Sequence, residues 1–230
     1  MLRETLLASL LAGLCAAVVL TCLQSVWVTP LILKGEVYED AAALKAAAPA
    51  PAESHHHDAD EWKPRDGTER TLYTAAADLL LSVGYAFVLV STYLLWRAPR
   101  TPLWGAVFGL AGFIVFFAAP ALGLPPELPG TAAAELSTRQ AWWVMTAAAT
   151  AVGLLLFFST SKLWIRLLAL AVLIAPHLVP APQPVTASSL APEELQSQFR
   201  LATTVCNAIF WLALGVASSV AFRKLVRRHV

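Results

Sequence analysis

Long runs of apolar residues constrain the fold of this chain more than any other feature. The hydrocarbon core of a bilayer is about 30 Å thick, so a crossing helix needs roughly 17–25 mostly apolar residues. Charged residues are only 13% of this chain, well below the quarter or so usual in soluble proteins. The sequence predicts an all-α, polytopic membrane helix bundle with about six transmembrane helices, at residues 5–28, 71–96, 102–119, 141–158, 163–179 and 201–222.

Basic residues set the expected orientation, because Lys and Arg in short loops stay on the cytoplasmic side. Nearly all acids fall on the opposite side, in segments 29–70, 120–140 and 180–200. We therefore expect a multi-pass protein with both termini in the cytoplasm. The basic residues on that side are Arg3, Arg97, Arg100, Lys162, Arg166, Arg223, Lys224, Arg227 and Arg228.

The first apolar run divides the chain into three expected parts. Residues 1–28 form a first transmembrane helix, 29–70 a His- and acid-rich extracytoplasmic loop, and 71–230 a five-helix membrane bundle with short loops and a basic tail. The run is longer than a signal-peptide core and no small-x-small cleavage site follows it, which favours an uncleaved anchor. The loop has too few apolar residues to fold alone, so we expect it to be mostly disordered, with a short helix near 40–47.

The loop contains the stretch AESHHHDADEW, with His55, His56, His57 and Asp58 at its centre. Neutral imidazole and carboxylate suit divalent first-row metals such as Co, Ni, Zn or Cu, and a His-rich tract is a compositional sign of metal binding. Adjacent imidazoles on a flexible backbone cannot form a rigid, selective site, so capture would be weak and fast. A solvated polar linker without a ligand is the alternative interpretation.

Three polar residues lie inside predicted spans, at roughly 6–10 Å from their outer ends by helical rise. Asp78 is the ionisable one, and such groups usually face a bundle interior or an aqueous path, so it is a candidate for an ion path. The alternative is a carboxylate in the first helical turns, reached by water and favoured by the helix dipole. Gln24 and Asn207 are expected to hydrogen-bond between helices along the same path.

Other candidates lie at the outer mouth and between helices. His177 follows Pro176, which leaves a carbonyl unpaired and favours an irregular helix end that lines a cavity; an interfacial histidine without a ligand is the alternative. The proline-rich connection after the third span holds Glu127 over the mouth. Gly105 and Gly109 have the spacing that lets two membrane helices approach closely.

Motifs of several enzyme classes are missing from the sequence. It contains no G-x-x-x-x-G-K-[ST], H-E-x-x-H or G-x-S-x-G motif, so we expect neither an ATPase of its own nor a membrane hydrolase. We expect membrane lipid around the chain, no organic cofactor and no nucleic-acid partner.

Several distinctive segments follow one another along nearly the whole chain: PLILKGEVYED (30–40), the His-bearing loop, ERTLYT (69–74), APALGLPPELPG (119–130), RQAWW (139–143) and APHLVPAP (175–182). Together they resemble the CbtA family of proposed cobalt transporter subunits. The resemblance implies a bacterial inner-membrane protein of cobalt uptake for cobalamin synthesis, with a small single-span, His-bearing partner, CbtB. The single HHHD cluster departs from the spaced histidines expected of the family. The residues to which the resemblance points are Glu36, Tyr38, Glu39, His55, His56, His57, Glu69, Glu127 and His177.

The sequence thus supports a membrane subunit for uptake of divalent cobalt. Co²⁺ would be collected by the HHHD tract and passed to a mouth lined by Glu36, Glu39, Glu127 and His177, with Asp78 below. Nickel, which takes similar N and O ligands, is the alternative cargo. The alternative function is a non-transporting assembly or metal-sensing subunit whose outer loop binds a partner.

Overall fold

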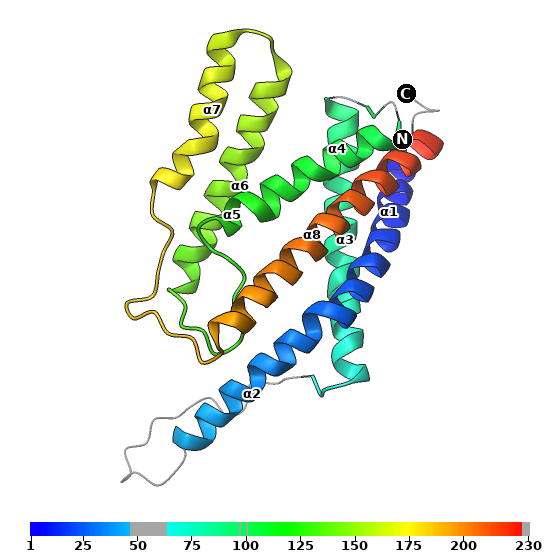
Figure 1. Cartoon of the computed structure of the whole chain (residues 1–230). Helices are drawn as coiled ribbons and strands as arrows, with labels where there is room; N and C mark the ends of the chain where they lie inside the picture. The colour runs from blue at the N-terminus through cyan, green and yellow to red at the C-terminus, as the bar shows by residue number, and fades with distance from the viewer. Residues whose placement is uncertain (47–63, 97, 100, 227–230) are drawn as a thin grey trace.

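A computed structural model describes residues 1–46, 64–96, 98–99 and 101–226, and shows an almost entirely helical chain (Figure 1). Elements labelled η are single stretches of π-helix inside or at the end of α-helices. No named strand occurs in the described part of the chain, which confirms the all-α class. The elements are α1 Leu2–Leu23, η1 Gln24–Val28, α2 Thr29–Ala46, α3 Thr68–Leu95, α4 Pro102–Phe113, η2 Ile114–Ala118, α5 Ala119–Ala121, α6 Leu136–Ser159, α7 Leu163–Leu178, α8 Glu193–Ala221 and η3 Phe222–Val226.

Within the described residues, five helical stretches are long and apolar enough to cross a membrane, which confirms the polytopic bundle. Helix α7, the predicted fifth span, has only 16 residues, or about 24 Å of helix against a core of about 30 Å. Pro176 lies inside its last turn. The five long stretches are Leu2–Lys45, Thr68–Leu95, Pro102–Ala121, Leu136–Ser159 and Glu193–Val226.

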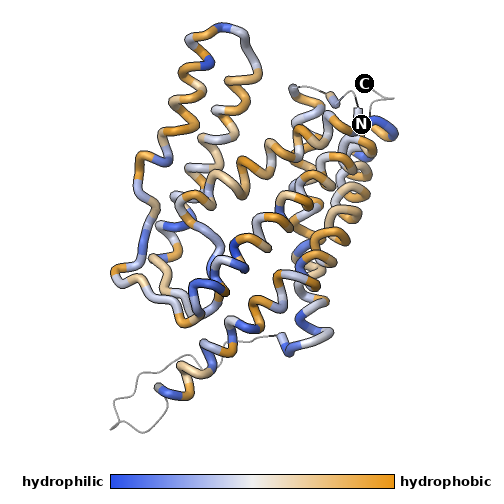
Figure 2. The backbone as a smooth tube through the Cα atoms, viewed as in Figure 1, coloured by the Kyte–Doolittle hydropathy of each residue, from blue (hydrophilic) through white to orange (hydrophobic). Residues whose placement is uncertain are grey.

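The two ends of the bundle differ in their chain segments and their charge. The start of α1 packs against η3, and the α3–α4 and α6–α7 connections lie at this same end (Figure 1). The opposite end carries the starts of α3, α6 and α8, and Figure 2 shows hydrophilic residues gathered there. This arrangement agrees with the predicted separation of basic and acidic connections. The assignment of the first end to the cytoplasm stays a prediction.

Two prolines follow π turns, and this pattern changes the predicted first span. The N–H of Thr29 donates to the carbonyl of Gln24, five residues back. The N–H of Ala119 donates to Ile114 in the same way. Pro30 and Pro120 come next in each case, and a proline cannot donate to the preceding turn. The wider π turn accommodates the hydrogen bond that the proline cannot make, so the helix continues past the proline.

Residues 29–46 form helix α2. The expectation of disorder is therefore wrong for residues 29–39, whereas the short helix expected near 40–47 is confirmed as far as Ala46. The C-terminal part of α2, EDAAALKA, consists of strong helix formers except for Asp40. A bidentate ion pair between Glu36 of α2 and Arg70 of α3 also attaches the helix to the bundle. The HHHD tract lies outside the described residues.

Small residues build the centre of the bundle, where α1, α3 and α8 meet. Ala8, Ala12 and Ala16 recur every four residues on α1 and are buried, so they form one face of that helix. Gly13 packs so tightly on α3 that an added Cβ would lie 2.6 Å from the Cα of Val83. Close backbone approach is typical of membrane helix interfaces. The large side chains that fill the remaining space are Leu20, Leu89, Val90, Tyr93, Phe210, Trp211, Leu214 and Phe222.

Helix α4 packs on α8 through glycines. A Cβ added to Gly105 would lie 2.3 Å from the carbonyl oxygen of Gly215, and one added to Gly109 would lie 2.1 Å from that of Trp211. The α6–α7 hairpin packs internally where Gly153 meets Leu173. It joins the rest of the bundle mainly through η2 and α5 (Figure 1).

Two connections at the acidic end are fixed to each other and to α8. The amide N–H of Ala132 donates to the carbonyl of Ser188 at 2.9 Å, next to the bridge between Thr131 and Ser189. Gln196 of α8 is 1% exposed. Its amide oxygen accepts from the backbone N–H of Leu128 at 3.2 Å, and its nitrogen donates to the hydroxyls of Thr131 and Ser189. The connection that contains Glu127 is therefore held in a defined position.

Candidate functional site

Asp78 is an acid in the interior of the bundle. It is 7% exposed and is the only buried Asp or Glu among the described residues. The Thr21 hydroxyl donates to its Oδ2 at 2.7 Å, and the Gln24 side chain also hydrogen-bonds to the carboxylate. Sequence analysis named Gln24 and Asp78, which the structure brings together between α1 and α3. Thr21 was missed, although it lies three residues from Gln24 and therefore on the same helix face.

A second polar group lies one turn further into α3. Ser82 is fully buried, and its hydroxyl has no hydrogen-bond partner in the described structure. It follows Asp78 by four residues, so both occupy one face of the helix. Asn207 is placed differently, because its side-chain nitrogen donates to the carbonyl of Thr203 on its own helix at 2.9 Å. The polar residues between α1 and α3 are thus Asp78 and Ser82, which are buried, and Thr21 and Gln24, which are partly buried.

The predicted mouth acids have different surroundings. Both oxygens of Glu36 accept from Arg70, at 2.6 and 2.9 Å, and Arg70 also donates to Asp66 at 3.0 Å. A guanidinium held in this bidentate way competes with any cation for the carboxylate. Glu39 is exposed on α2.

His177 is exposed in the last turn of α7, and its ring centroid lies 6.3 Å from that of Trp142. The indole N–H of Trp142 donates to the carbonyl of Val179 at 3.1 Å, which fixes the end of α7 against α6. Across the described part of the chain, no group of three or more His, Cys, Asp or Glu side chains is arranged to hold a metal ion.

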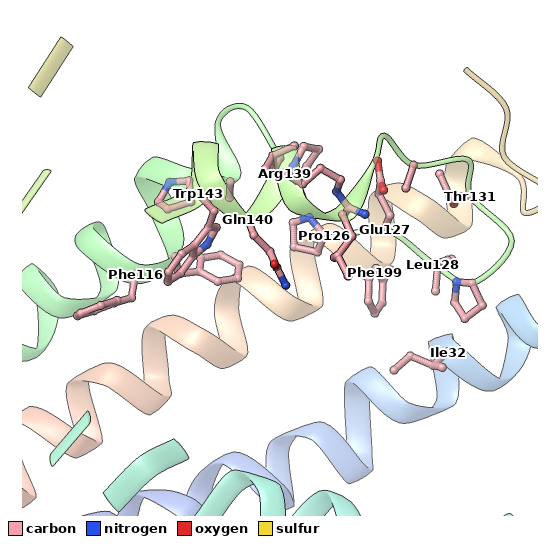
Figure 3. Close-up of a pocket in the computed structure, with 18 of the residues that line it drawn as sticks. Ile32, Phe116, Pro126, Glu127, Leu128, Thr131, Arg139, Gln140, Trp143 and Phe199 are labelled. Atoms are coloured by element: carbon pink, nitrogen blue, oxygen red, sulfur yellow. The ribbon is translucent and has the colours of Figure 1, made fainter. Parts of the chain in front are cut away.

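Glu127 lines a pocket of about 970 Å³ between the proline-rich connection, the start of α6 and the N-terminal part of α8 (Figure 3). This volume lies at the upper end of the range for small-molecule sites, roughly 300–1,000 Å³. Three polar side chains besides Glu127 line it, Thr131, Arg139 and Gln140. Its remaining walls are mostly apolar and include Ile32, Phe116, Phe117, Leu128, Trp143, Val144 and Phe199.

The polar groups of this pocket have few partners of their own. Glu127 and Arg139 lie at the same end of the pocket in Figure 3, and Gln140 extends from α6 toward α8. Neither Glu127 nor Arg139 takes part in an ion pair within the described residues. Sequence analysis placed Glu127 at the mouth but gave Arg139 and Gln140 no role. Their position in RQAWW, a segment that carries the family resemblance, was the available signal.

Comparison with known proteins gives one positive result. No curated protein and no solved structure is similar enough to the chain to match it. The model of a protein family described as "Probable cobalt transporter subunit (CbtA)" matches residues 2–223. This match covers nearly the whole chain, the buried Asp78 group and the outer pocket included. This description names cobalt as the probable cargo, and the word subunit implies a partner. The chain therefore belongs to the CbtA family of probable cobalt transporter subunits.

Proposed function

We propose that this chain is a membrane subunit through which Co²⁺ enters the cell, collected on the extracytoplasmic side by His and carboxylate side chains. Family membership supports cobalt as the cargo. The observation that carries the proposal is the buried carboxylate of Asp78, held by Thr21 and Gln24 between two apolar helices. Ionisable groups inside a membrane are costly and usually mark an ion path. Transport of a dication would explain why an acid occupies this buried position, because its carboxylate can bind the passing ion.

The membrane potential is sufficient to drive entry in this proposal. It contributes about 2.3 kcal/mol per charge per 100 mV, hence roughly twice that for a divalent ion. A carboxylate partway across the membrane lowers the cost of removing the ion from water, because it supplies the opposite charge that the hydrocarbon lacks. Asp78, with the oxygens of Thr21 and Gln24 beside it, would be the first intramembrane station. Asn207 is proposed further along the same path.

The outer ligands are proposed mainly from the sequence. His55, His56, His57 and Asp58 would collect the ion on a tether between α2 and α3. The exposed side chains of Glu39, Glu127 and His177 would receive it. Glu36 could join them only by giving up its ion pair with Arg70. Weak, rapidly exchanging sites are appropriate for collection, because tight binding would delay release.

The remaining parts of the proposal follow from family resemblance. We place the chain in a bacterial inner membrane, with a small, single-span, His-bearing partner of the CbtB type. Nickel is the alternative cargo, since it takes similar ligands and the Irving–Williams order favours it. We propose no catalytic role for the chain.

Uptake of radioactive cobalt at limiting metal tests the Asp78 step. We expect Asp78→Asn to reduce the rate about tenfold or more, the size of effect typical when a group that supports metal binding is lost. Asp40→Asn is a matched control, because Asp40 is an exposed acid on α2. Equal uptake by Asp78→Asn and the control would remove Asp78 from the path.

The collecting step needs a separate variant. Replacing His55, His56, His57 and His177 with Ala should lower uptake at limiting cobalt and leave it unchanged at saturating cobalt, because collection matters only when the ion is scarce. His229→Ala, in the basic tail, is the control. Uptake equal to that of the parent protein at limiting metal would exclude these ligands.

Reconstitution in vesicles, with and without a partner subunit, distinguishes transport from an assembly or sensing role. If no combination moves metal, the transport proposal fails.

A further inference from the structure

The outer pocket has the wrong chemistry for a bare metal ion. Among the described residues that line it, Glu127 is the only one of the His, Cys, Asp or Glu type. First-row divalent ions are held by several such ligands. Arg139 is half-buried in the same pocket and has no acidic partner among the described residues. Its positive charge repels a free dication.

The same pocket has suitable chemistry for an organic anion. A guanidinium presents its N–H groups in a fork that matches a carboxylate. Gln140 adds an amide that extends from α6 toward α8 (Figure 3). The walls contain Phe116, Trp143 and Phe199, which suit the carbon skeleton of a small molecule. At about 970 Å³ the pocket has room for an organic molecule and an ion together.

Three of the segments that resemble the CbtA family contribute residues to the pocket. Segments 30–40, 119–130 and 139–143 all contribute lining residues, among them Ile32, Leu128 and Trp143. These segments come from three different parts of the chain and meet at this place. The pocket is therefore formed jointly by segments that are far apart in the sequence.

We propose that cobalt occupies this pocket as a complex with a small organic carboxylate, a hydroxy acid or an amino acid, and not as the bare ion. Arg139 and Gln140 bind the carboxylate, and Glu127 faces the metal as its one protein ligand. The carboxylates of the chelator neutralise charge on the ion, so Arg139 repels it less, and a carboxylate oxygen that the metal leaves free accepts from the guanidinium. This inference rests on the proposed function, because it specifies the form in which the cargo arrives.

Binding to the purified full-length protein tests the idea without transport. The probes are radiolabelled citrate and radiolabelled L-histidine, each measured by equilibrium dialysis with and without Co²⁺. We expect at least one probe to be retained when Co²⁺ is present and to be retained much less without it. Arg139→Gln should weaken retention about tenfold or more, because hydrogen bonds to charged groups contribute strongly. Arg139→Lys keeps the charge but loses the fork, so it should give an intermediate loss.

Arg65→Gln is the matched control, because Arg65 is 90% exposed, lies at the same end of the molecule and does not line the pocket. Circular dichroism and size-exclusion profiles confirm that each variant is folded. Retention of neither probe, or equal retention by Arg139→Gln and the parent, overturns the inference. So would phospholipid that copurifies with the parent and is lost in Arg139→Gln, since the pocket would then be a lipid site.

Cobalt uptake separates this inference from the proposed function. If uptake occurs with Co²⁺ alone and Arg139→Gln leaves it unchanged, the chelate inference fails while the transport function stands. If neither free nor chelated cobalt is taken up under any condition, the transport function fails. Binding of the complex to the purified protein remains an independent result in that case.

Discussion

Replacing Gly109 with alanine probes the closest helix contact in the bundle. An added Cβ would lie 2.1 Å from the carbonyl oxygen of Trp211 and 3.2 Å from the Cα of Gly215. Carbon–oxygen contacts between helices are normally about 3.3–3.6 Å. Helix α4 must therefore move away from α8 by about 1 Å. No side chain can rotate to relieve the overlap, because the contacted atoms belong to the backbone.

The expected cost comes from two opposing effects. Overpacking of an interior contact typically destabilises a protein by about 1–3 kcal/mol. Alanine also favours the helix over glycine by about 1 kcal/mol, which offsets part of that cost. Gly84→Ala isolates the second effect, because a Cβ at Gly84 meets nothing within 4 Å. The difference in unfolding free energy between the two variants should therefore be about 1–3 kcal/mol, with Gly109→Ala the less stable.

Equilibrium unfolding in mixed micelles, followed by tryptophan fluorescence, measures this difference. Trp211 lies at the contact and reports its loss. Equal stability of Gly109→Ala and Gly84→Ala would refute the close packing of α4 on α8. A greater destabilisation by Gly84→Ala than by Gly109→Ala would refute it more strongly, since a Cβ at Gly84 meets nothing within 4 Å.

Two further predictions concern the outer end of the bundle. Gln196→Leu leaves the backbone N–H of Leu128 buried without its acceptor, at a cost of about 1–3 kcal/mol. Hydrogen exchange at that amide should accelerate, and unchanged exchange would contradict the bond. Glu135 caps α6, and hydrogen bonds from the Ser137 hydroxyl and from the Ser137 and Thr138 amides hold the pKa of its carboxyl below the usual range. Its contribution to stability is present above the unfolded pKa and is lost as pH falls through the lower folded pKa. Thermal unfolding of Glu135→Gln should lack this part of the acid dependence, and an identical pH profile for parent and variant would contradict it.

Much of the helical architecture could be predicted from the sequence, because apolar runs of bilayer length require helices. The course of the chain after Val28 could not be predicted in the same way. Proline predicts a break when only its missing hydrogen bond is considered. Here a π turn shifts the bonding pattern before Pro30, so the helix continues to Ala46. The sequence predicts only the last part of this helix, near residues 40–47, and the HHHD tract comes after it in the sequence.

The candidate site could be predicted in part for a similar reason. Depth along a helix depends only on residue number, so Asp78 and Gln24 were both placed in the outer leaflet. Contact between α1 and α3 depends on how the two helices are aligned, which no local pattern specifies. The hydrogen bond from Thr21 to Asp78 joins residues 57 positions apart. The pocket is harder to predict than this contact, because its shape depends on how Gln196 joins two connections from different parts of the chain.

The π turn η1 contacts both candidate sites, the Asp78 carboxylate and the cluster beside the pocket. Gln24, its first residue, hydrogen-bonds to Asp78. Val28, its last residue, belongs to the same buried cluster as Leu128 and Phe199, and both of those residues line the outer pocket. Five residues of helix therefore connect the buried carboxylate to the pocket wall. A π turn is a common place for a helix to adjust at functional sites. The proposed ion path between the pocket and Asp78 is therefore short, because the helical segment that supplies a partner of Asp78 also packs against residues of the pocket wall.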